Sequence, residues 1–312
     1  LAAASRYIRE GRGYVVDIDL AKYFDTVNHD RLMHRLSQDI ADKQVLKLIR
    51  SYLQADIMRD GLVEQRQRGT PQGGPLSPLL SNIVLDELDK ELERRGHKFC
   101  RYADDCQIYV CSEEASHRVK ESITEFLEQK LKLTVNREKS GATRVTERSY
   151  LSHRFGIDGG IHISKPAHAQ MRKRVRQITK RNRGRELKVI IIELTQYLRG
   201  WQHYFKLAMR KSAMQRLDEW IRRRLRCYRL KQRKRRYGIA TWLQQQGVTE
   251  RNAWKLAMSD KGWWRLALTP QVNHAMPIKW FEELGLYSLR DGYESLKVYS
   301  EPPYATHACT VV

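Results

Sequence analysis

Residues 98–111 read KFCRYADDCQIYVC, and this stretch decides the fold because apolar and aromatic residues flank two adjacent carboxylates on both sides. Ile108, Val110 and the cysteines around them predict the two strands of a buried hairpin. Asp104 and Asp105 then lie at its tip. Paired acids in a turn are commonly just solvated, but strands this apolar place the pair beside a sheet rather than on a free loop.

A further strand is predicted over residues 14–19, YVVDID, where β-branched and aromatic residues alternate. Asp17 and Asp19 share one face of this strand. The Gly- and Pro-rich stretch 69–78 predicts a turn that opens a helix. The other predicted elements of this region are helices over 29–37, 42–53 and 113–131, a short strand over Leu133–Val135, and a strand or hairpin around 150–163. Mixed strands and helices predict an α+β fold with a palm-like antiparallel sheet.

Three of these acids indicate a particular chemistry if Asp19 meets Asp104 and Asp105 across the sheet. Carboxylates within about 4 Å repel by several kcal/mol even at an effective dielectric constant of about 20. Hard divalent cations relieve this repulsion, and two Mg²⁺ ions roughly 3.5 to 4 Å apart activate a 3′-hydroxyl and stabilise a leaving pyrophosphate. We therefore predict nucleotidyl transfer with two Mg²⁺ ions. Asp19 and Asp104 share both ions, Asp105 adds a ligand or shapes the site, and the Leu20 carbonyl is a further ligand.

The charge of the chain is concentrated in one region. Between Lys165 and Arg236 there are 25 Lys and Arg residues against four acids, a net charge of +21, whereas the rest holds 33 basic and 32 acidic residues. Charge of one sign at this density repels itself unless a polyanion neutralises it, so nucleic acid is the favoured partner. Apolar residues at helical spacing over 188–208 and 213–230 predict packed helices with basic outer faces.

These observations predict three regions: 1–163 with the palm-like sheet, 164–258 with the basic helices, and 259–312 as a C-terminal extension with a short helix near 278–284. No stretch of 18 uncharged apolar residues occurs, so no membrane-spanning helix is expected. No secretory leader is recognised, and the five cysteines lack paired spacing, which argues against a disulfide framework and a zinc site. A cytoplasmic location is therefore expected.

Four motifs resemble those of reverse transcriptases. Residues 17–32, DIDLAKYFDTVNHDRL, and 102–105, YADD, are similar to the two metal-binding motifs of that family, and 70–78, TPQGGPLSP, to its template-grip motif. The form of the first motif resembles bacterial group II intron reverse transcriptases in particular. Residues 198–205, LRGWQHYF, resemble the maturase or X domain, which also acts as the polymerase thumb. The resemblance extends from near residue 5 to near residue 290 and implies a reverse transcriptase palm followed by an all-helical basic thumb or maturase domain.

The resemblance also implies roles for individual residues. Phe24 matches the aromatic gate that rejects a 2′-hydroxyl, and Gln72 with Gly73 matches the segment near the incoming nucleotide and template. Asn136 and Lys139 match a later motif whose lysine lies near the triphosphate and is able to donate a proton to the leaving pyrophosphate. The basic helices are expected to bind intron RNA and the template duplex by phosphate contacts. Their candidate RNA-binding residues are Arg172, Lys173, Arg174, Lys180, Arg181, Arg222, Arg223, Arg226, Arg233 and Lys234.

The family resemblance leads to an RNA-directed DNA polymerase with maturase activity as the leading hypothesis. Its partners are intron RNA, an RNA template with a DNA primer, and dNTP, with no membrane. The family's upstream fingers segment is expected to be missing before Leu1, and a Cys- and His-bearing endonuclease domain is not expected. One alternative is an RNA-binding splicing cofactor without polymerase activity. A retron-like or defence-associated reverse transcriptase is a third possibility, which the 198–205 motif disfavours. The particular intron, the DNA target and the oligomeric state stay open.

Overall fold

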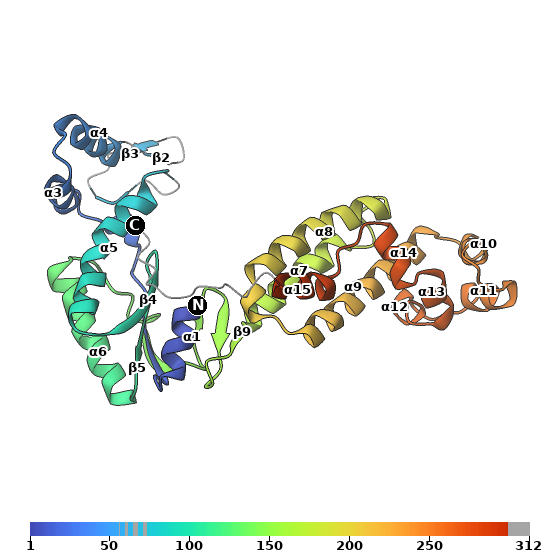
Figure 1. Cartoon of the computed structure of the whole chain (residues 1–312). Helices are drawn as coiled ribbons and strands as arrows, with labels where there is room; N and C mark the ends of the chain where they lie inside the picture. Colours follow the sequence, from blue (N-terminus) through green and yellow to red (C-terminus); the bar gives the residue numbers. More distant parts are fainter. Residues whose placement is uncertain (56, 60–61, 65–67, 71–73, 299–312) are drawn as a thin grey trace. The chain divides into compact units, whose positions relative to one another are not determined.

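The computed structural model describes residues 1–55, 57–59, 62–64, 68–70 and 74–298, which form two compact units divided between Ile161 and His162 (Figure 1). Gln72 and Gly73 lie outside the described residues, as does the chain beyond 298. No helix in the described part of the chain is both long and apolar enough to cross a membrane.

The first unit combines helices with an antiparallel sheet, as the sequence predicts. Its helices and strands are, in chain order, α1 (Ala2–Arg9), β1 (Tyr14–Ile18), α2 (Tyr23–Thr26), α3 (His29–Asp39), α4 (Lys43–Gln54), β2 (Ile57–Arg59), β3 (Leu62–Glu64), α5 (Ser77–Arg94), β4 (Lys98–Tyr102), β5 (Asp105–Val110), α6 (Glu113–Glu125), the π-helix η1 (Phe126–Lys130), β6 (Gly141–Arg144), β7 (Ser149–Tyr150) and β8 (His153–Phe155). The strand β9 (Ile161–Ile163) contains the division between the two units. The predicted hairpin over 98–111 is confirmed as β4 and β5.

The main sheet has the strand order β4-β5-β1-β6, so β1 lies between two antiparallel neighbours. Pairing of β1 with β5 runs from Tyr14 opposite Val110 to Ile18 opposite Cys106. Continuing this register by one residue places Asp19 opposite Asp105. The strand that ends in acids and the hairpin that carries the acid pair are therefore direct neighbours.

The two faces of the main sheet have different surroundings because side chains alternate along each strand. Val16, Ile18 and Ile108 are fully buried and belong to one core with apolar residues of α3, α5 and α6. Val15 and Tyr109 point to the opposite face, where they pack with residues of α1 and with Tyr150 and Phe155. By the same alternation Asp17 and Asp19 lie on this second face, away from the core beneath α5 and α6.

The second unit is helical throughout its described elements after β9. These elements are α7 (Lys165–Ile178), α8 (Leu187–Tyr204), the 3₁₀ turn η2 (Lys206–Ala208), α9 (Lys211–Gln232), α10 (Arg236–Gln245), α11 (Glu250–Ala257), α12 (Trp263–Leu266), α13 (Pro270–Ala275), α14 (Ile278–Glu283) and α15 (Leu289–Val298). The helices predicted over 188–208 and 213–230 are confirmed, and their apolar stripes are buried. Asp218 of α9 accepts hydrogen bonds from the backbone N–H groups of Leu289 and Arg290, which ties the first turn of α15 to α9.

Two details differ from the sequence predictions. The strand predicted over Leu133–Val135 is reduced to one bridge, Val135 opposite Leu20, because Lys132 takes a left-handed φ of +56° just before it and Asn136 turns to bond Asp19. Three residues of alternating pattern do not distinguish a strand from one bridge. The region after 259 also contains α12, α13 and α15 besides the predicted short helix, which is α14.

Candidate active site

Asp19 follows β1 directly, and its backbone is held on both sides by the segment that leads into β6. Its N–H donates to the hydroxyl of Ser140 at 3.0 Å, and its carbonyl accepts from the N–H of Asn136 at 2.9 Å. The next residue, Leu20, forms the bridge with Val135. The position of Asp19 is therefore fixed by hydrogen bonds that span more than a hundred residues of sequence.

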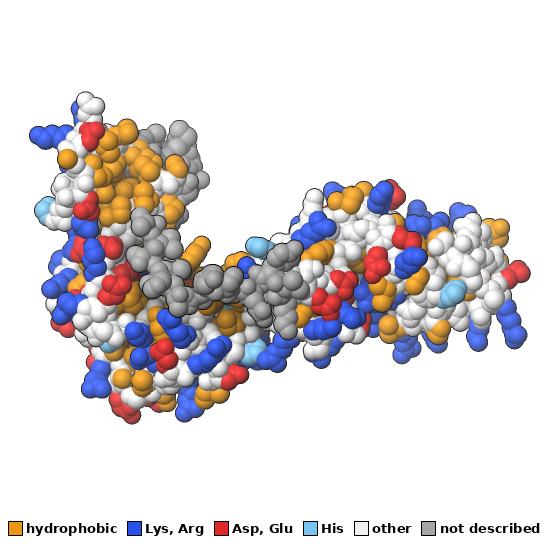
Figure 2. All heavy atoms as spheres, in the orientation of Figure 1, with side chains coloured by type: hydrophobic (Ala, Val, Ile, Leu, Met, Phe, Trp, Pro, Cys, Tyr) orange, Lys and Arg blue, Asp and Glu red, His pale blue; other side chains and the backbone are white. Residues whose placement is uncertain are grey.

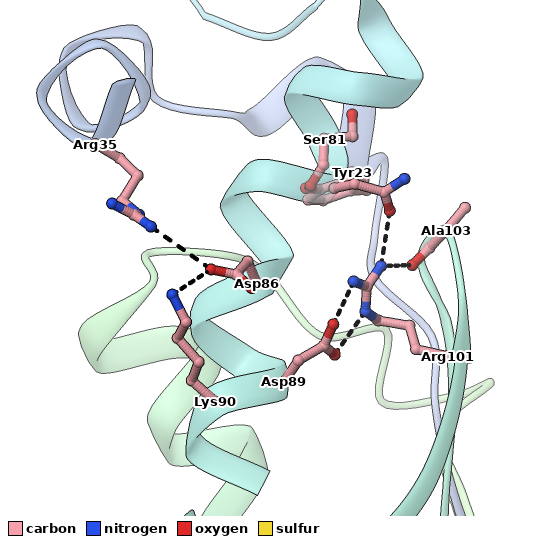
Figure 3. Close-up of polar contacts among 9 residues, drawn as sticks. Tyr23, Arg35, Ser81, Asp86, Asp89, Lys90, Arg101 and Ala103 are labelled. Atoms are coloured by element: carbon pink, nitrogen blue, oxygen red, sulfur yellow. Dashed lines mark hydrogen bonds and ion pairs between the residues drawn. The ribbon is translucent and has the colours of Figure 1, made fainter. Parts of the chain in front are cut away.

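The hairpin tip is a two-residue turn, because Tyr102 pairs with Asp105 and only Ala103 and Asp104 lie between them. Ala103 has a φ of +53°, a left-handed conformation that costs a non-glycine residue about 1–2 kcal/mol. Figure 3 shows Arg101 beside this turn, where its guanidinium donates to the Ala103 carbonyl at 2.9 Å and forms a two-pronged ion pair with Asp89 of α5. Arg101 thus links the hairpin turn to α5, whose apolar side chains form part of the core.

Electrostatic repulsion among carboxylates is visible at Asp105. Its pKa is raised to about 6, first by burial and then by the neighbouring carboxylates, in the order Asp17, Asp104 and Asp19. Burial also raises the pKa of Asp17, against the opposing effects of a hydrogen bond from Gln107 and the charge of Arg148. Four carboxylates therefore lie within electrostatic range at one edge of the sheet, and their negative charge is only partly offset.

The fit to a metal ion rests on the chemistry of these side chains. Asp19, Asp104 and Asp105 supply the carboxylate oxygens that Mg²⁺ prefers, and their mutual repulsion is the condition that a cation relieves. As the side chains lie, no group of three or more His, Cys, Asp or Glu in the described part of the chain is gathered closely enough to hold a metal ion. The structure brings the three acids to neighbouring backbone positions without closing them into a cage.

Phe24 is half-buried on the short helix α2, next to Tyr23, whose hydroxyl donates to the Ser81 carbonyl of α5 at 2.6 Å. The rings of Tyr23 and Phe24 meet edge to face with centroids 5.6 Å apart. The carbonyl of Phe24 accepts from the N–H of Thr70 at 2.6 Å, and the carbonyl of Val27 accepts from the N–H of Gly69 at 2.8 Å. The start of the 69–78 turn is therefore pinned beside Phe24, although Gln72 and Gly73 themselves lie outside the described residues.

Asn136 and Lys139 lie in the short segment that holds Asp19. The side-chain oxygen of Asn136 accepts from the N–H of Lys139 at 3.3 Å. The ammonium of Lys139 lies 3.8 Å from Oδ2 of Asp19, and the lysine side chain is 72% exposed. Lys139 is thus a solvent-exposed positive charge beside Asp19.

Comparison with known proteins agrees with these motifs. The family described as reverse transcriptase (RNA-dependent DNA polymerase) matches residues 6–155, and the family described as group II intron, maturase-specific domain, matches residues 168–246. The chain therefore carries the reverse transcriptase domain and the maturase-specific domain of group II intron-encoded proteins. The first unit is accordingly the reverse transcriptase palm, and the maturase-specific residues belong to the helical unit.

Individual relatives cover only part of this family architecture. The chain is 32% identical to the protein YkfC of Escherichia coli (strain K12) over 182 residues, which are 47% of this chain and 48% of that protein. It is 37% identical to the group II intron-encoded protein LtrA of Lactococcus lactis subsp. cremoris over 91 residues, 29% of this chain and 15% of LtrA. These matches span less than half the length of either relative. Among solved structures, apo telomerase from Candida tropicalis aligns with this chain at 10% identity and a TM-score of 0.47. The alignment covers 91% of this chain and 55% of the telomerase chain.

The predicted RNA-binding residues of the maturase helices differ in their exposure to solvent. Lys and Arg side chains are spread along the helical unit on the face shown in Figure 2. The guanidinium of Arg226 is instead buried, donates twice to the Met276 carbonyl and lies 5.6 Å from the Phe281 ring, and burial lowers its pKa to about 10. Six of the ten are exposed: Arg172, Lys173, Arg174, Lys180, Arg181 and Lys234. Three are half-buried: Arg222, Arg223 and Arg233.

Several residues that shape the palm site were not found from the sequence. Arg101 and Ser140 support the acids from distant positions, and no local pattern marks such long-range partners. Asp17 gave a signal, since it shares a face with Asp19, but its repulsion with Asp105 depends on the sheet register. Gly69 also gave a signal as the first residue of the turn, although its contact with Phe24 required the fold.

Proposed function

We propose that this chain carries the polymerase site and the RNA-binding helices of an RNA-directed DNA polymerase that also assists the splicing of its group II intron. In this function the chain extends a DNA primer along an RNA template with dNTP. The observation that carries the proposal is the strand register, which brings Asp19 beside the Asp104–Asp105 turn at one edge of the palm sheet, where burial and then the other carboxylates raise the pKa of Asp105.

Asp19, Asp104 and Asp105 are the residues that hold two Mg²⁺ ions in this proposal, together with the carbonyl of Leu20. Bound there, the ions would supply activation of the primer 3′-hydroxyl and charge stabilisation of the leaving pyrophosphate. Without a cation, like charges drive the carboxylate side chains apart while the backbone keeps them adjacent.

The remaining residues act on the nucleotide and the primer. The Phe24 ring packs edge to face on Tyr23, and in this proposal it rejects a 2′-hydroxyl, as the resemblance implies. Lys139 is free to turn from Asp19 toward a triphosphate and donate a proton to the pyrophosphate oxygen. Gln72 and Gly73 follow the pinned residues Gly69 and Thr70 and contact the incoming nucleotide and template. The exposed candidates of the maturase helices bind phosphates of the intron RNA and the template duplex; they are Arg172, Lys173, Arg174, Lys180, Arg181 and Lys234.

Primer extension with an RNA template, a DNA primer and Mg²⁺ tests this function. Asp104→Asn is expected to abolish synthesis, whereas Asp39→Asn, an acid at the exposed end of α3, keeps it. Calorimetric titration with Mg²⁺ gives a second readout, in which Asp104→Asn weakens binding and Asp39→Asn does not. A chain that binds RNA but shows no metal-dependent synthesis, or equal behaviour of the two variants, contradicts the proposal.

A second candidate function is an RNA-binding splicing cofactor without polymerase activity. It is favoured by the concentration of positive charge in the helical unit and by the acids, which as they lie in the described residues do not form a metal-holding group. In this case Asp104→Asn leaves intron RNA binding and splicing unchanged and wild type shows no synthesis. Splicing and primer extension measured on the same preparation distinguish the two functions.

A further inference from the structure

Three arginines gather around one tryptophan of the helical unit, and a fourth acts electrostatically on one of them. Arg172 and Arg176 lie one turn apart on α7, and Arg224 follows Trp220 by one turn on α9. Their guanidinium carbons lie 5.4, 5.9 and 5.5 Å from the centroid of the Trp220 ring. Arg181, just beyond α7, is close enough for its charge to act on Arg224. The indole thus holds positive side chains from two helices at one place.

These arginines have no acidic counterpart in the described part of the chain, where none of the four forms an ion pair with Asp or Glu. The neighbouring basic residues behave differently. Arg174, Arg183 and Arg185 all pair with Glu193, at 3.7, 3.0 and 3.5 Å. One glutamate therefore serves the adjacent arginines, and the arginines around Trp220 keep their full positive charge.

The fold fixes this cluster despite its repulsion. Nε of Arg224 donates to the hydroxyl of Thr179 at 2.6 Å, and its Nη2 donates to the Arg176 carbonyl at 3.4 Å. Thr179 in turn donates to the Val175 carbonyl at 2.6 Å, at the end of α7, where the helix dipole favours a cation. The pKa of Arg224 is lowered by burial and then by Arg176 and Arg181, as expected of like charges held together.

We propose that Trp220 holds these guanidiniums as a preorganised site for consecutive phosphates of an RNA backbone. Guanidinium groups bind phosphate with two parallel hydrogen bonds, and stacking on a ring fixes their orientation without consuming those donors. Trp220 is a positioning residue, because arginines cover its ring and the phosphates contact them. The site rests on the RNA binding within the proposed function and adds to it Arg176, Arg224 and Trp220.

The decisive variant removes no charge. Trp220→Leu is expected to weaken binding of a single-stranded RNA oligonucleotide roughly 3- to 30-fold at low salt, since each cation–π contact contributes about 0.5–2 kcal/mol. Trp220→Phe keeps a ring face and is expected to restore most of the affinity. Arg176→Gln, at an exposed position, is expected to reduce the slope of log affinity against log salt by about 0.7–0.9 for one lost phosphate contact.

Lys188→Gln is the matched control, an exposed cation at the start of α8 that removes the same charge. The proposal is overturned if Trp220→Leu, with an unfolding transition like that of wild type, binds RNA as wild type does. It is also overturned if Arg176→Gln and Lys188→Gln change the salt slope equally. The readout is RNA affinity, so a chain that binds through this cluster but extends no primer contradicts the polymerase proposal and supports this one.

Discussion

Gly69→Ala tests the contact that pins the 69–78 turn beside Phe24. Gly69 has a φ of +86°, and a Cβ there would lie 2.6 Å from the Phe24 carbonyl oxygen and 2.8 Å from backbone atoms of Asp25. Both neighbours are backbone atoms, which do not rotate away as a side chain does. The substitution must therefore displace either the turn or the segment that carries Phe24.

The free-energy cost of Gly69→Ala has two parts, and comparison with Gly96→Ala separates them. A left-handed non-glycine residue costs about 1–2 kcal/mol, and forcing atoms into a packed contact adds about 1–3 kcal/mol. We expect Gly69→Ala to lower the free energy of unfolding by roughly the sum, about 2–5 kcal/mol. Gly96 also has a positive φ, +73°, but a Cβ there meets no heavy atom within 4 Å. Gly96→Ala should therefore cost only about 1–2 kcal/mol.

The assay must report the first unit alone. All seven tryptophans lie in the second unit, so their fluorescence follows that unit and serves as an internal control. Cys106 is 2% exposed in β5, and its labelling by a thiol reagent in increasing urea follows unfolding of the palm. If the two alanine variants lose the same stability by Cys106 labelling, the close contact with Phe24 contributes nothing and the reasoning is wrong.

Three further predictions concern Asp105, Asp218 and Arg101. The pKa of Asp105 is raised to about 6, so the folded chain binds its proton more tightly than the unfolded chain. The contribution of this group to stability therefore falls as pH rises from 3.8 to about 6. Mg²⁺ should consequently raise the melting temperature more above pH 7 than at about pH 5, and Asp105→Asn should remove the difference. Asp218→Ala leaves the N–H groups of Leu289 and Arg290 without their acceptor and should lower the free energy of unfolding of the second unit by about 1–3 kcal/mol. Tryptophan fluorescence follows this unfolding transition, and an unchanged midpoint would contradict the prediction. Arg101→Lys keeps the charge but loses the two-pronged pair with α5, so primer extension should slow while RNA affinity stays constant, and equal rates would exclude a positioning role.

Local patterns were sufficient for the elements that carry the site. The apolar and aromatic residues of 98–111 predicted the hairpin, because β5 is buried on both of its faces, and the same reasoning placed the acid pair at its tip. Helical spacing identified α8 and α9, because the apolar stripe of each helix is buried. These predictions depend only on which face of an element avoids water, a property that each segment carries by itself.

Contacts between distant segments were not accessible from the sequence. Ser140 meets Asp19 across 121 residues, and Arg101 meets Asp89 through the packing of α5 on the sheet. Arg226 illustrates the same limit in the helical unit. It follows Leu225 in a run of arginines, and only the position of Met276, 50 residues later, explains why its guanidinium is buried while that of Arg172 is exposed. Composition counts a positive charge without showing where it lies.

Strand register connects the palm core to the candidate site. In β1 the residues that face α5 and α6 are Val16 and Ile18, and the residues between and after them are Asp17 and Asp19. A slip of one residue would move both carboxylates into the apolar core and bring Val16 and Ile18 to the other face. Burying an unpaired carboxylate is far more costly than any gain from such a slip. The apolar residues of β1 therefore determine where its acids lie, and substitutions in this core that shift the register would disrupt the candidate site without touching a carboxylate.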